Sequence, residues 1–260
     1  MRFNALITGA SSGIGYEFAK ICAEHGHDLI LVARREEKLQ AVKQDFERAF
    51  KIKVTVLPYD LSKPTAPEEI FNSLKRQQIP IDILVNNAGF GDFGLFVGAD
   101  WKKLSEMIQV NITALTHLTK LFLPGMIERK SGKILNIAST AAFGAGPLMA
   151  VYYATKGYVL QLSEALAREL QRTGVTVTVL CPGPTETGFQ AVAGSQQSKL
   201  VQGKKIPTAR DVAQFGFDAM NKGKVVAVHG LMNSLLVQVT RFLPRKAVVE
   251  LVYKIQESKK

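Results

Sequence analysis

The chain has 260 residues, of which 47% are hydrophobic and 21% are charged, a composition that excludes wholesale disorder and collagen-like structure. This length suits one large hydrophobic core and is short for two full domains. The formal net charge is +11, but no helix-turn-helix, zinc-finger or RNA-binding signature accompanies the basic residues, so we expect no nucleic-acid partner.

Short apolar runs alternate with longer amphipathic stretches along most of the chain. The runs, each about five residues and rich in Val, Ile and Leu, cover residues 4–8, 28–33, 54–57, 81–86, 133–138, 175–180 and 224–229. Such runs are typical of strands buried on both faces. The intervening stretches, among them 15–25, 36–50 and 152–172, place their apolar residues on one helical face. The alternation predicts an α/β fold with a doubly wound, seven-stranded parallel sheet.

The first predicted strand leads directly into a glycine-rich turn, GASSGIG over residues 9–15, and a helix follows. In this context Gly9 permits a tight turn, Gly13 lets the backbone approach a pyrophosphate, and Gly15 lets the helix pack close to the strand. The helix N-terminus adds free N–H groups and a partial positive charge. The turn therefore predicts a phosphate cradle for a dinucleotide.

Other interpretations of this turn are open. Gly9, Ser11 and Gly13 also fit the nucleophile elbow of a hydrolase, although no earlier strand is present to supply an oxyanion donor. The Gly-Lys-Ser/Thr of a phosphate-hydrolysing P-loop is absent. The glycines would alternatively serve a sharp turn and nothing more.

The end of the second predicted strand favours NADP(H) over NAD. An NAD-selective site places an acidic residue there to hold the ribose 2′-hydroxyl, whereas this chain has Ala33 followed by Arg34 and Arg35. A guanidinium fork suits a 2′-phosphate. The alternative is that both arginines are simply solvated residues in the first turn of a helix.

Tyr152 and Lys156 are four residues apart and share one face of a predicted helix. A neighbouring ammonium favours the ionised phenol, so we expect the pKa of Tyr152 to lie below its usual value and the phenol to serve as a proton donor or acceptor. Tyr153 has Gly157 at the equivalent spacing, which offers no such partner. Ser139 follows the fifth strand, and Asn111 lies inside the apolar stretch 107–115.

Taken in order, these motifs resemble those of the short-chain dehydrogenase/reductase family. They are TG-x3-G-x-G at 8–15, NNAG at 86–89, Asn111, Ser139, Y-x3-K at 152–156 and PG at 182–183, spanning residues 3–187. The resemblance implies a Rossmann-type fold and a catalytic tetrad of Asn111, Ser139, Tyr152 and Lys156. It also implies a set of cofactor contacts: Gly9, Ser11, Ser12, Gly13, Ile14, Gly15, Arg34, Arg35, Asp60, Leu61, Asn87, Ala88, Gly89, Tyr152, Lys156, Pro182, Gly183 and Thr187.

The resemblance further implies direct hydride transfer between a nicotinamide and a carbonyl carbon or its alcohol. Ser139 would hold the substrate oxygen, and Tyr152 would give it a proton or remove one. Lys156 would bind the nicotinamide ribose and favour the ionised phenol, and Asn111 would hold a water that links Lys156 to solvent. A different class of function, a non-catalytic NADP-binding sensor or scaffold, fits the same fold but gives no reason for Tyr152 and Lys156 together.

The residues expected around the substrate are apolar, which suits a small-molecule substrate such as a hydrophobic ketone, an aldehyde or a 3-oxoacyl compound. They are Phe90, Phe93, Phe96, Phe143, Leu148, Met149 and Phe189, of which Phe143, Met149 and Phe189 join Ser139 as predicted substrate contacts. Each of these would alternatively only pack its loop. Lys199, Lys204 and Lys205 would meet an acidic carrier or a coenzyme A phosphate, or else be solvated loop charges.

We expect a Rossmann-type domain over residues 1–230, including a substrate loop at 183–207, and an amphipathic helical extension over 231–260 that is broken at Pro244. Leu231, Leu235, Val239 and Phe242 share one helical stripe. The extension could dock on the body, cover the mouth of the substrate site, join a partner subunit or rest on a membrane surface. Docking or contact within an oligomer is the expected use, with peripheral membrane contact the lesser alternative. The resemblance also implies a homodimer or homotetramer paired through 113–128 and 152–172. We expect no metal ligand among the histidines. Because no signal-peptide pattern is present, we expect a cytoplasmic protein.

Overall fold

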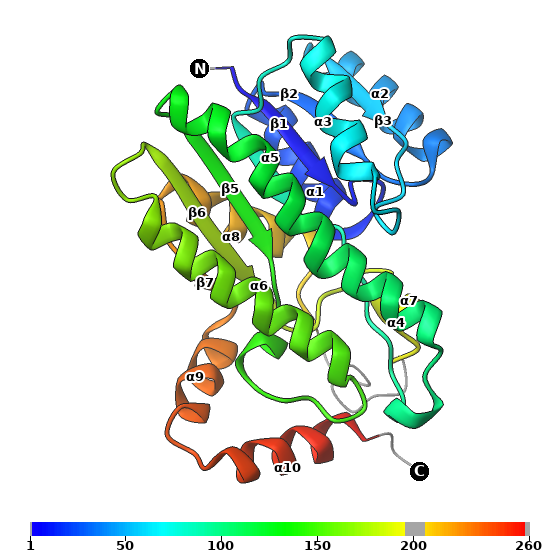
Figure 1. The fold of residues 1–260 in the computed structure, drawn as a ribbon, viewed down its shortest axis with the longest axis vertical. Helices are drawn as coiled ribbons and strands as arrows, with labels where there is room; N and C mark the ends of the chain where they lie inside the picture. The colour runs from blue at the N-terminus through cyan, green and yellow to red at the C-terminus, as the bar shows by residue number, and fades with distance from the viewer. Residues whose placement is uncertain (1, 196–205, 258–260) are drawn as a thin grey trace.

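The computed structural model describes residues 2–195 and 206–257. Within these ranges seven strands form one parallel sheet in the order β3-β2-β1-β4-β5-β6-β7 (Figure 1). The strands are β1 (Asn4–Thr8), β2 (Asp28–Val32), β3 (Val54–Leu57), β4 (Ile83–Asn86), β5 (Gly132–Ile137), β6 (Val175–Cys181) and β7 (Val226–Val228). Each predicted strand is confirmed to within two residues at either end, and so is the doubly wound fold.

The sheet grows in two directions from β1: β2 and β3 are added on one side, and β4 to β7 on the other. This strand pairs with β2 from Asn4 opposite Asp28 to Thr8 opposite Val32, and it pairs with β4 on its other edge. Chains that leave β1 and β4 therefore turn to opposite faces of the sheet and open a crevice beyond the carboxyl ends of the strands.

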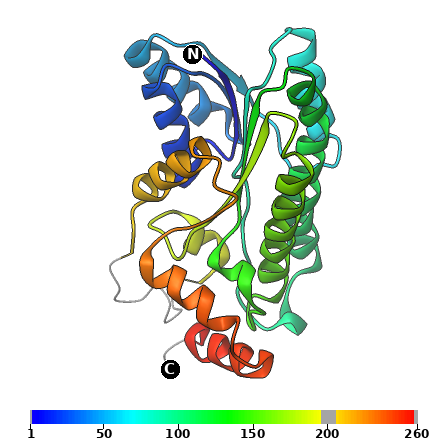
Figure 2. The same cartoon turned by 90° about the vertical axis from the view of Figure 1, so that its left-hand side faces the viewer.

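Helices cover both faces of the sheet in two layers (Figure 2). One layer holds α1 (Gly13–Glu24), α2 (Glu36–Phe50) and α8 (Ala209–Asn221), and the other holds α3 (Ala66–Arg76), α5 (Leu115–Glu128) and α6 (Ala150–Glu169). Phe18, Phe46 and Phe217 lie in the core beneath the first layer, and Ile70 and Leu118 lie in the core beneath the second. The sheet is thus buried on both sides, as its apolar strands predict.

Shorter elements lie near the carboxyl ends of the strands. They are η1 (Phe96–Gly98), α4 (Trp101–Ile108), η2 (Gln109–Ala114), η3 (Thr140–Phe143) and α7 (Phe189–Ala193). The segment η2 is a π-helical turn that joins α4 to α5. A π-helical turn inside a longer helix is rare and is often found at functional sites; here it carries Asn111.

The extension beyond β7 forms α9 (Leu231–Thr240) and α10 (Arg245–Gln256), with the break at Pro244 as predicted. Asn233 of α9 lies on the backbone of Gly183, and its Nδ2 donates a hydrogen bond to the carbonyl of His229 at 2.8 Å. Val248 of α10 lies against Gly144. The extension therefore packs on the loops that follow β5 and β6, beyond the arrowheads of the sheet in Figure 1.

The extension docks on the body as expected, but the stripe of Leu231, Leu235, Val239 and Phe242 is not the side that packs there. These side chains are exposed, whereas Val237 and Val248 are buried. The amphipathic pattern identifies the apolar stripe but not the side of the helix that the body covers. Here that side is determined by the contacts of Asn233 with Gly183 and of Val248 with Gly144.

In the described ranges, no helix has both the length and the apolar character that a membrane crossing requires. Part of the predicted substrate loop, including Lys199, Lys204 and Lys205, lies outside the described residues.

Candidate active site

The glycine-rich turn forms a cradle at the start of α1. Gly9 and Gly13 have positive φ angles of 67° and 58°, a conformation that favours glycine. A Cβ on Gly15 would lie 2.5 Å from the carbonyl oxygen of Gly9, so any larger residue would push α1 away from the strand. The free N–H groups of α1 consequently face the carboxyl end of β1, where a phosphate fits.

One cavity of about 900 Å³ extends from this cradle to the extension at the other side of the molecule. Its walls include every predicted cofactor contact apart from Gly15, whose contribution is the close packing described above. The volume is within the range of cofactor and ligand sites in proteins.

Basic side chains surround the end of the cavity beside β2. Arg34, Arg35 and Lys38 line it, and the Arg35 guanidinium donates a hydrogen bond to Ser11 Oγ at 3.3 Å. Asp60 and Leu61, predicted to border an adenine, line the same region. The Asp60 carboxylate accepts a hydrogen bond from the backbone N–H of Ser62 at 3.0 Å, which stabilises the turn after β3.

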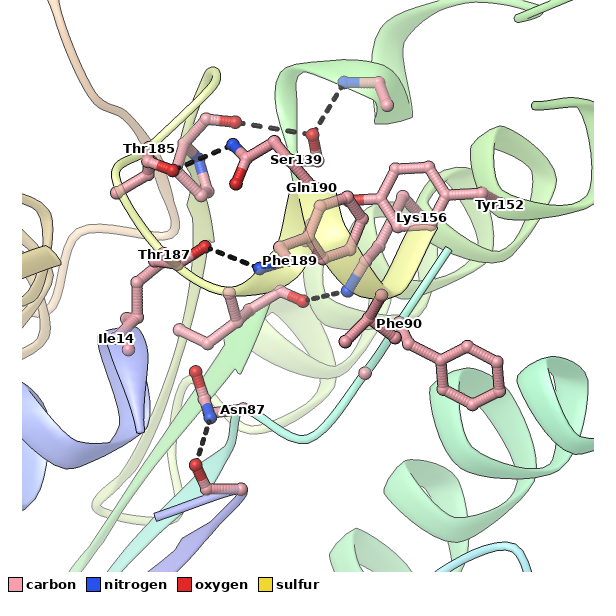
Figure 3. A pocket seen from close by; sticks show the side chains of 18 of the residues that line it. Ile14, Asn87, Phe90, Ser139, Tyr152, Lys156, Thr185, Thr187, Phe189 and Gln190 are labelled. Carbon is pink, nitrogen blue, oxygen red and sulfur yellow. Dashed lines mark hydrogen bonds between the residues drawn. The ribbon is translucent and has the colours of Figure 1, made fainter. Parts of the chain in front are cut away.

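The NNAG segment is held to β1 by the hydroxyl of Thr8. Thr8 Oγ1 accepts hydrogen bonds from the backbone N–H groups of Asn87 and Ala88 at 3.0 and 2.9 Å. Asn87 Nδ2 in turn donates to the carbonyl of Thr8 at 2.8 Å (Figure 3). These bonds fix the two strand ends on either side of the crevice relative to each other.

Ser139, Tyr152 and Lys156 line the same cavity, and Figure 3 shows the three side chains close together. Ser139 Oγ accepts a hydrogen bond from the N–H of Ala141 at 3.1 Å and donates to the carbonyl of Pro182 at 3.3 Å. Lys156 Nζ lies 5.8 Å from the centre of the Tyr152 ring. It donates to the carbonyl of Ile137 at 2.8 Å, so β5 positions both Ser139 and Lys156.

Burial determines the pKa values of this cluster. Tyr152 and Lys156 are 8% and 5% exposed. Burial raises the pKa of the Tyr152 phenol, with a hydrogen bond from Ser139 opposing the rise. It lowers the pKa of the Lys156 ammonium to about 8. The expected lowering of the Tyr152 pKa by Lys156 is not found in this structure, because burial is the largest cause of the shift and Lys156 is not among its causes. The phenol is protonated at neutral pH, which suits donation to a carbonyl oxygen.

Asn111 is buried behind the cavity wall. Its Nδ2 donates to the carbonyl of Phe90 and to Thr155 Oγ1, both at 3.0 Å, and its Oδ1 accepts from the N–H of Phe90 at 3.1 Å. A Cβ on Gly89 would lie 3.0 Å from Asn111 Oδ1 and 3.4 Å from Lys156 Nζ. Gly89 thus allows the amide and the ammonium to approach the same point on the backbone.

The predicted substrate contacts divide into two groups. Phe90, Phe143, Met149 and Phe189 line the cavity together with Ser139, and the ring of Phe189 lies 5.2 Å from that of Tyr152. Phe93, Phe96 and Leu148 are not among the lining residues within the described ranges, which favours the alternative that they only pack their loops. The chain between residues 93 and 96 turns outward, and Phe96 is 66% exposed.

Several lining residues escaped the sequence reasoning. Tyr153 reaches the cavity, and burial raises its pKa to about 12. Gly91 leaves room for the site, because a Cβ there would lie 2.9 Å from Met149 and 3.3 Å from Tyr152. The extension contributes an entire wall, formed by Asn233, Leu236, Val237, Thr240, Val248, Leu251, Val252, Ile255 and Gln256. The amphipathic pattern of the extension allows it to cover the substrate mouth, but it does not identify which of these side chains line the cavity.

The cavity has a glycine cradle at one end, which suits a dinucleotide. Further along it has a serine, a tyrosine and a lysine, which suit a small carbonyl compound. A sequence model described as short chain dehydrogenase matches residues 4–198. This chain belongs to the short-chain dehydrogenase/reductase family. The family uses a nicotinamide cofactor, and the cradle, the NNAG segment and Lys156 fit one.

Among curated relatives, the very-long-chain 3-oxoacyl-CoA reductase of Homo sapiens is 29% identical over 253 residues, which cover 95% of this chain and 78% of that protein. The protein of the same description from Pyrenophora tritici-repentis is 31% identical over 252 residues, covering 94% and 72%.

Among solved structures, a short-chain dehydrogenase from Sphingobium yanoikuyae in complex with NADPH superposes with a TM-score of 0.82 at 29% identity, covering 98% of each chain. The bulky-bulky ketone specific alcohol dehydrogenase from Comamonas testosteroni gives 0.79 at 27% identity, covering 92% of each. This short-chain dehydrogenase/reductase therefore shares its fold with them over nearly its full length.

Proposed function

We propose that this protein is an NADP(H)-dependent oxidoreductase that transfers a hydride between the nicotinamide and the carbonyl of a hydrophobic ketone, aldehyde or 3-oxoacyl compound. The observation that carries the proposal is the placement of Ser139, Tyr152 and Lys156 on the same continuous cavity as the glycine cradle. A non-catalytic sensor has no use for a buried phenol and a buried ammonium side by side, because each costs free energy to desolvate.

In the proposed reaction the bound cofactor supplies or accepts the hydride. Ser139 Oγ holds the substrate oxygen, and the Tyr152 hydroxyl donates a proton to that oxygen during reduction. The raised pKa of Tyr152 keeps this proton in place at neutral pH. Lys156 holds the cofactor ribose from a position fixed by Ile137. Asn111 acts as a positioning residue through its bonds to Phe90 and Thr155.

The preference for NADP(H) over NAD rests on charge at the β2 end of the cavity. Arg34, Arg35 and Lys38 place three cations there, and arginine binds phosphate with paired hydrogen bonds. The Sphingobium yanoikuyae neighbour was crystallised with NADPH. We infer that a 2′-phosphate binds between these side chains.

The proposed substrate is mainly apolar with at least one polar group distant from the carbonyl. Leu251, Val252 and Ile255 supply an apolar wall. Gln256 is 1% exposed on the same wall, and among the described residues neither of its amide atoms has a hydrogen-bond partner. A buried amide without partners is costly, and a substrate hydrogen-bonding group would remove that cost. The relatives described as 3-oxoacyl-CoA reductases act on a compound of this general kind.

The test is a panel of short ketones, long-chain aldehydes and 3-oxoacyl thioesters offered with NADPH, followed by loss of NADPH absorbance. We expect turnover of long-chain compounds at a kcat/KM well above that of short ketones. If NADPH binds by calorimetry yet no compound is reduced, the protein is a sensor or scaffold and the proposal fails. The location in the cytoplasm, the division at residue 230 and pairing through 113–128 and 152–172 stay predictions.

A further inference from the structure

We propose that the end of the molecule that carries the cavity rests on the surface of an anionic lipid bilayer. The docking surface consists of Leu231, Met232, Leu235 and Phe242 on the extension together with Val97 and Trp101 on the η1–α4 segment. This inference concerns where the protein works and does not depend on which carbonyl compound it reduces.

The outer face of α9 and of the turn that follows it is apolar and uncovered. Leu231 is 93% exposed, Phe242 is 88% exposed and Met232 is 67% exposed. The opposite face of the same helices is buried against the cavity, with Val237 and Val248 at 7% each. A helix such as α9 that is apolar on both sides, with only one side packed on the protein, favours a second apolar environment.

A second exposed apolar group lies at the same end of the molecule. Val97 is 92% exposed and Trp101 is 72% exposed. In Figure 1 and Figure 2 the η1–α4 segment and the extension both lie at the lower end, beyond the carboxyl ends of the strands. Two segments far apart in sequence thus present large apolar side chains on one end, and Trp101 is of the residue type enriched where protein meets the bilayer interface.

The basic residues beside the docking surface favour an anionic lipid bilayer as its partner. Residues 231–249 contain no Asp or Glu. Arg241 lies in the turn after α9, and Arg245 and Lys246 begin α10; all three are exposed. Apolar side chains bordered by basic ones are the pattern that binds anionic lipid. A second copy of this chain docked by two-fold symmetry would place the same basic segment on both sides of the interface, and residues 231–249 offer these cations no carboxylate. Anionic lipid headgroups pair with these cations instead.

The placement has a consequence for the substrate. Leu236 is 51% exposed on the outer side and also lines the cavity, so the docking surface adjoins the wall of the site. An apolar substrate dissolved in the bilayer would enter the cavity without crossing bulk water.

The experiment uses the full-length protein and vesicles of phosphatidylcholine containing about 30% phosphatidylglycerol, since anionic lipid is the proposed partner. Trp101 is the only tryptophan, so its fluorescence reports insertion directly. We expect cosedimentation with these vesicles and a blue shift of the emission. Binding to pure phosphatidylcholine should be at least about tenfold weaker, and each of Arg241→Gln and Arg245→Gln should weaken binding about fivefold.

The decisive variant is Leu231→Glu/Phe242→Glu, because neither side chain lines the cavity. It should lose vesicle binding by about tenfold or more while its melting temperature and its turnover of a soluble substrate stay unchanged. Ile127→Glu is the matched control: Ile127 is 38% exposed near the end of α5, just before β5 begins and so at the opposite end of the sheet.

Two results would overturn the inference. One is undiminished vesicle binding by the double variant. The other is no vesicle binding at all, accompanied by a dimer in sedimentation velocity that the double variant abolishes, which would assign the surface to a second copy. Because turnover of a soluble substrate is measured separately, failure of the docking proposal and failure of the proposed enzyme activity give different results.

Discussion

At the scale of single residues, Lys156 is subject to two opposing effects: the proposed reaction needs its positive charge, and burial disfavours that charge. Its ammonium is almost fully buried, and burial lowers its pKa to about 8. The carbonyl of Ile137 accepts one of its hydrogen bonds, and the group that opposes the lowering of its pKa is Cys181 rather than a carboxylate. The charge that the proposed reaction needs is therefore present at neutral pH and is lost just above it.

This balance predicts the pH dependence of cofactor use. The folded pKa lies below the usual 10.5, so the lysine loses its proton as the pH rises through about 8. We expect kcat/KM for NADPH to be level below that pH and to fall about tenfold per unit above it, as free-enzyme profiles report. In Lys156→Arg the decline near pH 8 should disappear, because arginine stays protonated. A wild-type profile that is level to pH 10 would contradict the assignment.

Cofactor selectivity also belongs to this scale. Arg34→Gln should raise the KM for NADPH about 10- to 100-fold, the usual value of one charge-assisted bond to phosphate, and should leave the KM for NADH unchanged. Steady-state kinetics with both cofactors measure this. Arg48→Gln, near the far end of α2, the helix that follows Arg34, is the control, since Arg48 is exposed and, among the described residues, pairs with Asp45 on its own helix. An equal rise in KM for NADPH and for NADH would show that Arg34 does not bind the 2′-phosphate.

At the scale of elements, the strands behind the site are joined by buried polar side chains. Asn86 Nδ2 donates to Asn136 Oδ1 at 2.9 Å and to Thr119 Oγ1 at 3.1 Å, linking β4, β5 and α5. Asn136 Nδ2 donates to Ser163 Oγ at 2.9 Å, which adds α6. The helix that carries Tyr152 and the strand that leads to Ser139 are therefore fixed to each other inside the core.

Asn136→Ala should break this link. It removes two buried hydrogen bonds and leaves their partners poorly satisfied, so we expect a loss of about 2 kcal/mol in the free energy of unfolding, measured by urea denaturation. Thr176→Ala, at an exposed position near the beginning of the neighbouring strand β6, should cost much less. An Asn136 variant as stable as the wild type would mean that the network contributes nothing to holding the site together.

The elements also show how far the sequence could lead. Buried strands and the glycine turn are specified locally, by apolar runs and by residues that tolerate positive φ, and these were predicted closely. The π-helical turn at Asn111 was not, because it depends on the bonds that Asn111 makes to Phe90 and Thr155 across the fold. The pKa of Tyr152 was predicted in the wrong direction, because residue spacing shows the neighbouring Lys156 but not how deeply both groups are buried.

At the scale of the whole molecule, the helices α9 and α10 form part of the cavity wall. Residues that follow the last strand supply the wall opposite the glycine cradle, and Gln256 lies in that wall. No local pattern identifies this closure, since it follows from where α9 and α10 cross the loops at Gly183 and Gly144.

Gln256→Leu tests this part of the site. Removing a buried amide without described partners should raise the free energy of unfolding by about 1 kcal/mol, visible as a higher melting temperature. The KM for a long-chain substrate that bears a polar group should rise about tenfold while kcat stays the same. The control is the corresponding hydrocarbon-chain substrate, whose KM should not change. A destabilised variant with unaltered kinetics would show that Gln256 is structural.

The central claim is that the Tyr152 phenol transfers the proton in a hydride-transfer reaction, and single-turnover reduction with NADPH tests it most directly. Tyr152→Phe should bind NADPH as the wild type does and slow the single turnover by about 100-fold or more, the usual loss for an acid–base group. Tyr153→Phe, on the same helix and the same cavity, should remain close to the wild-type rate. A Tyr152→Phe protein that turns over at nearly the normal rate would contradict the account.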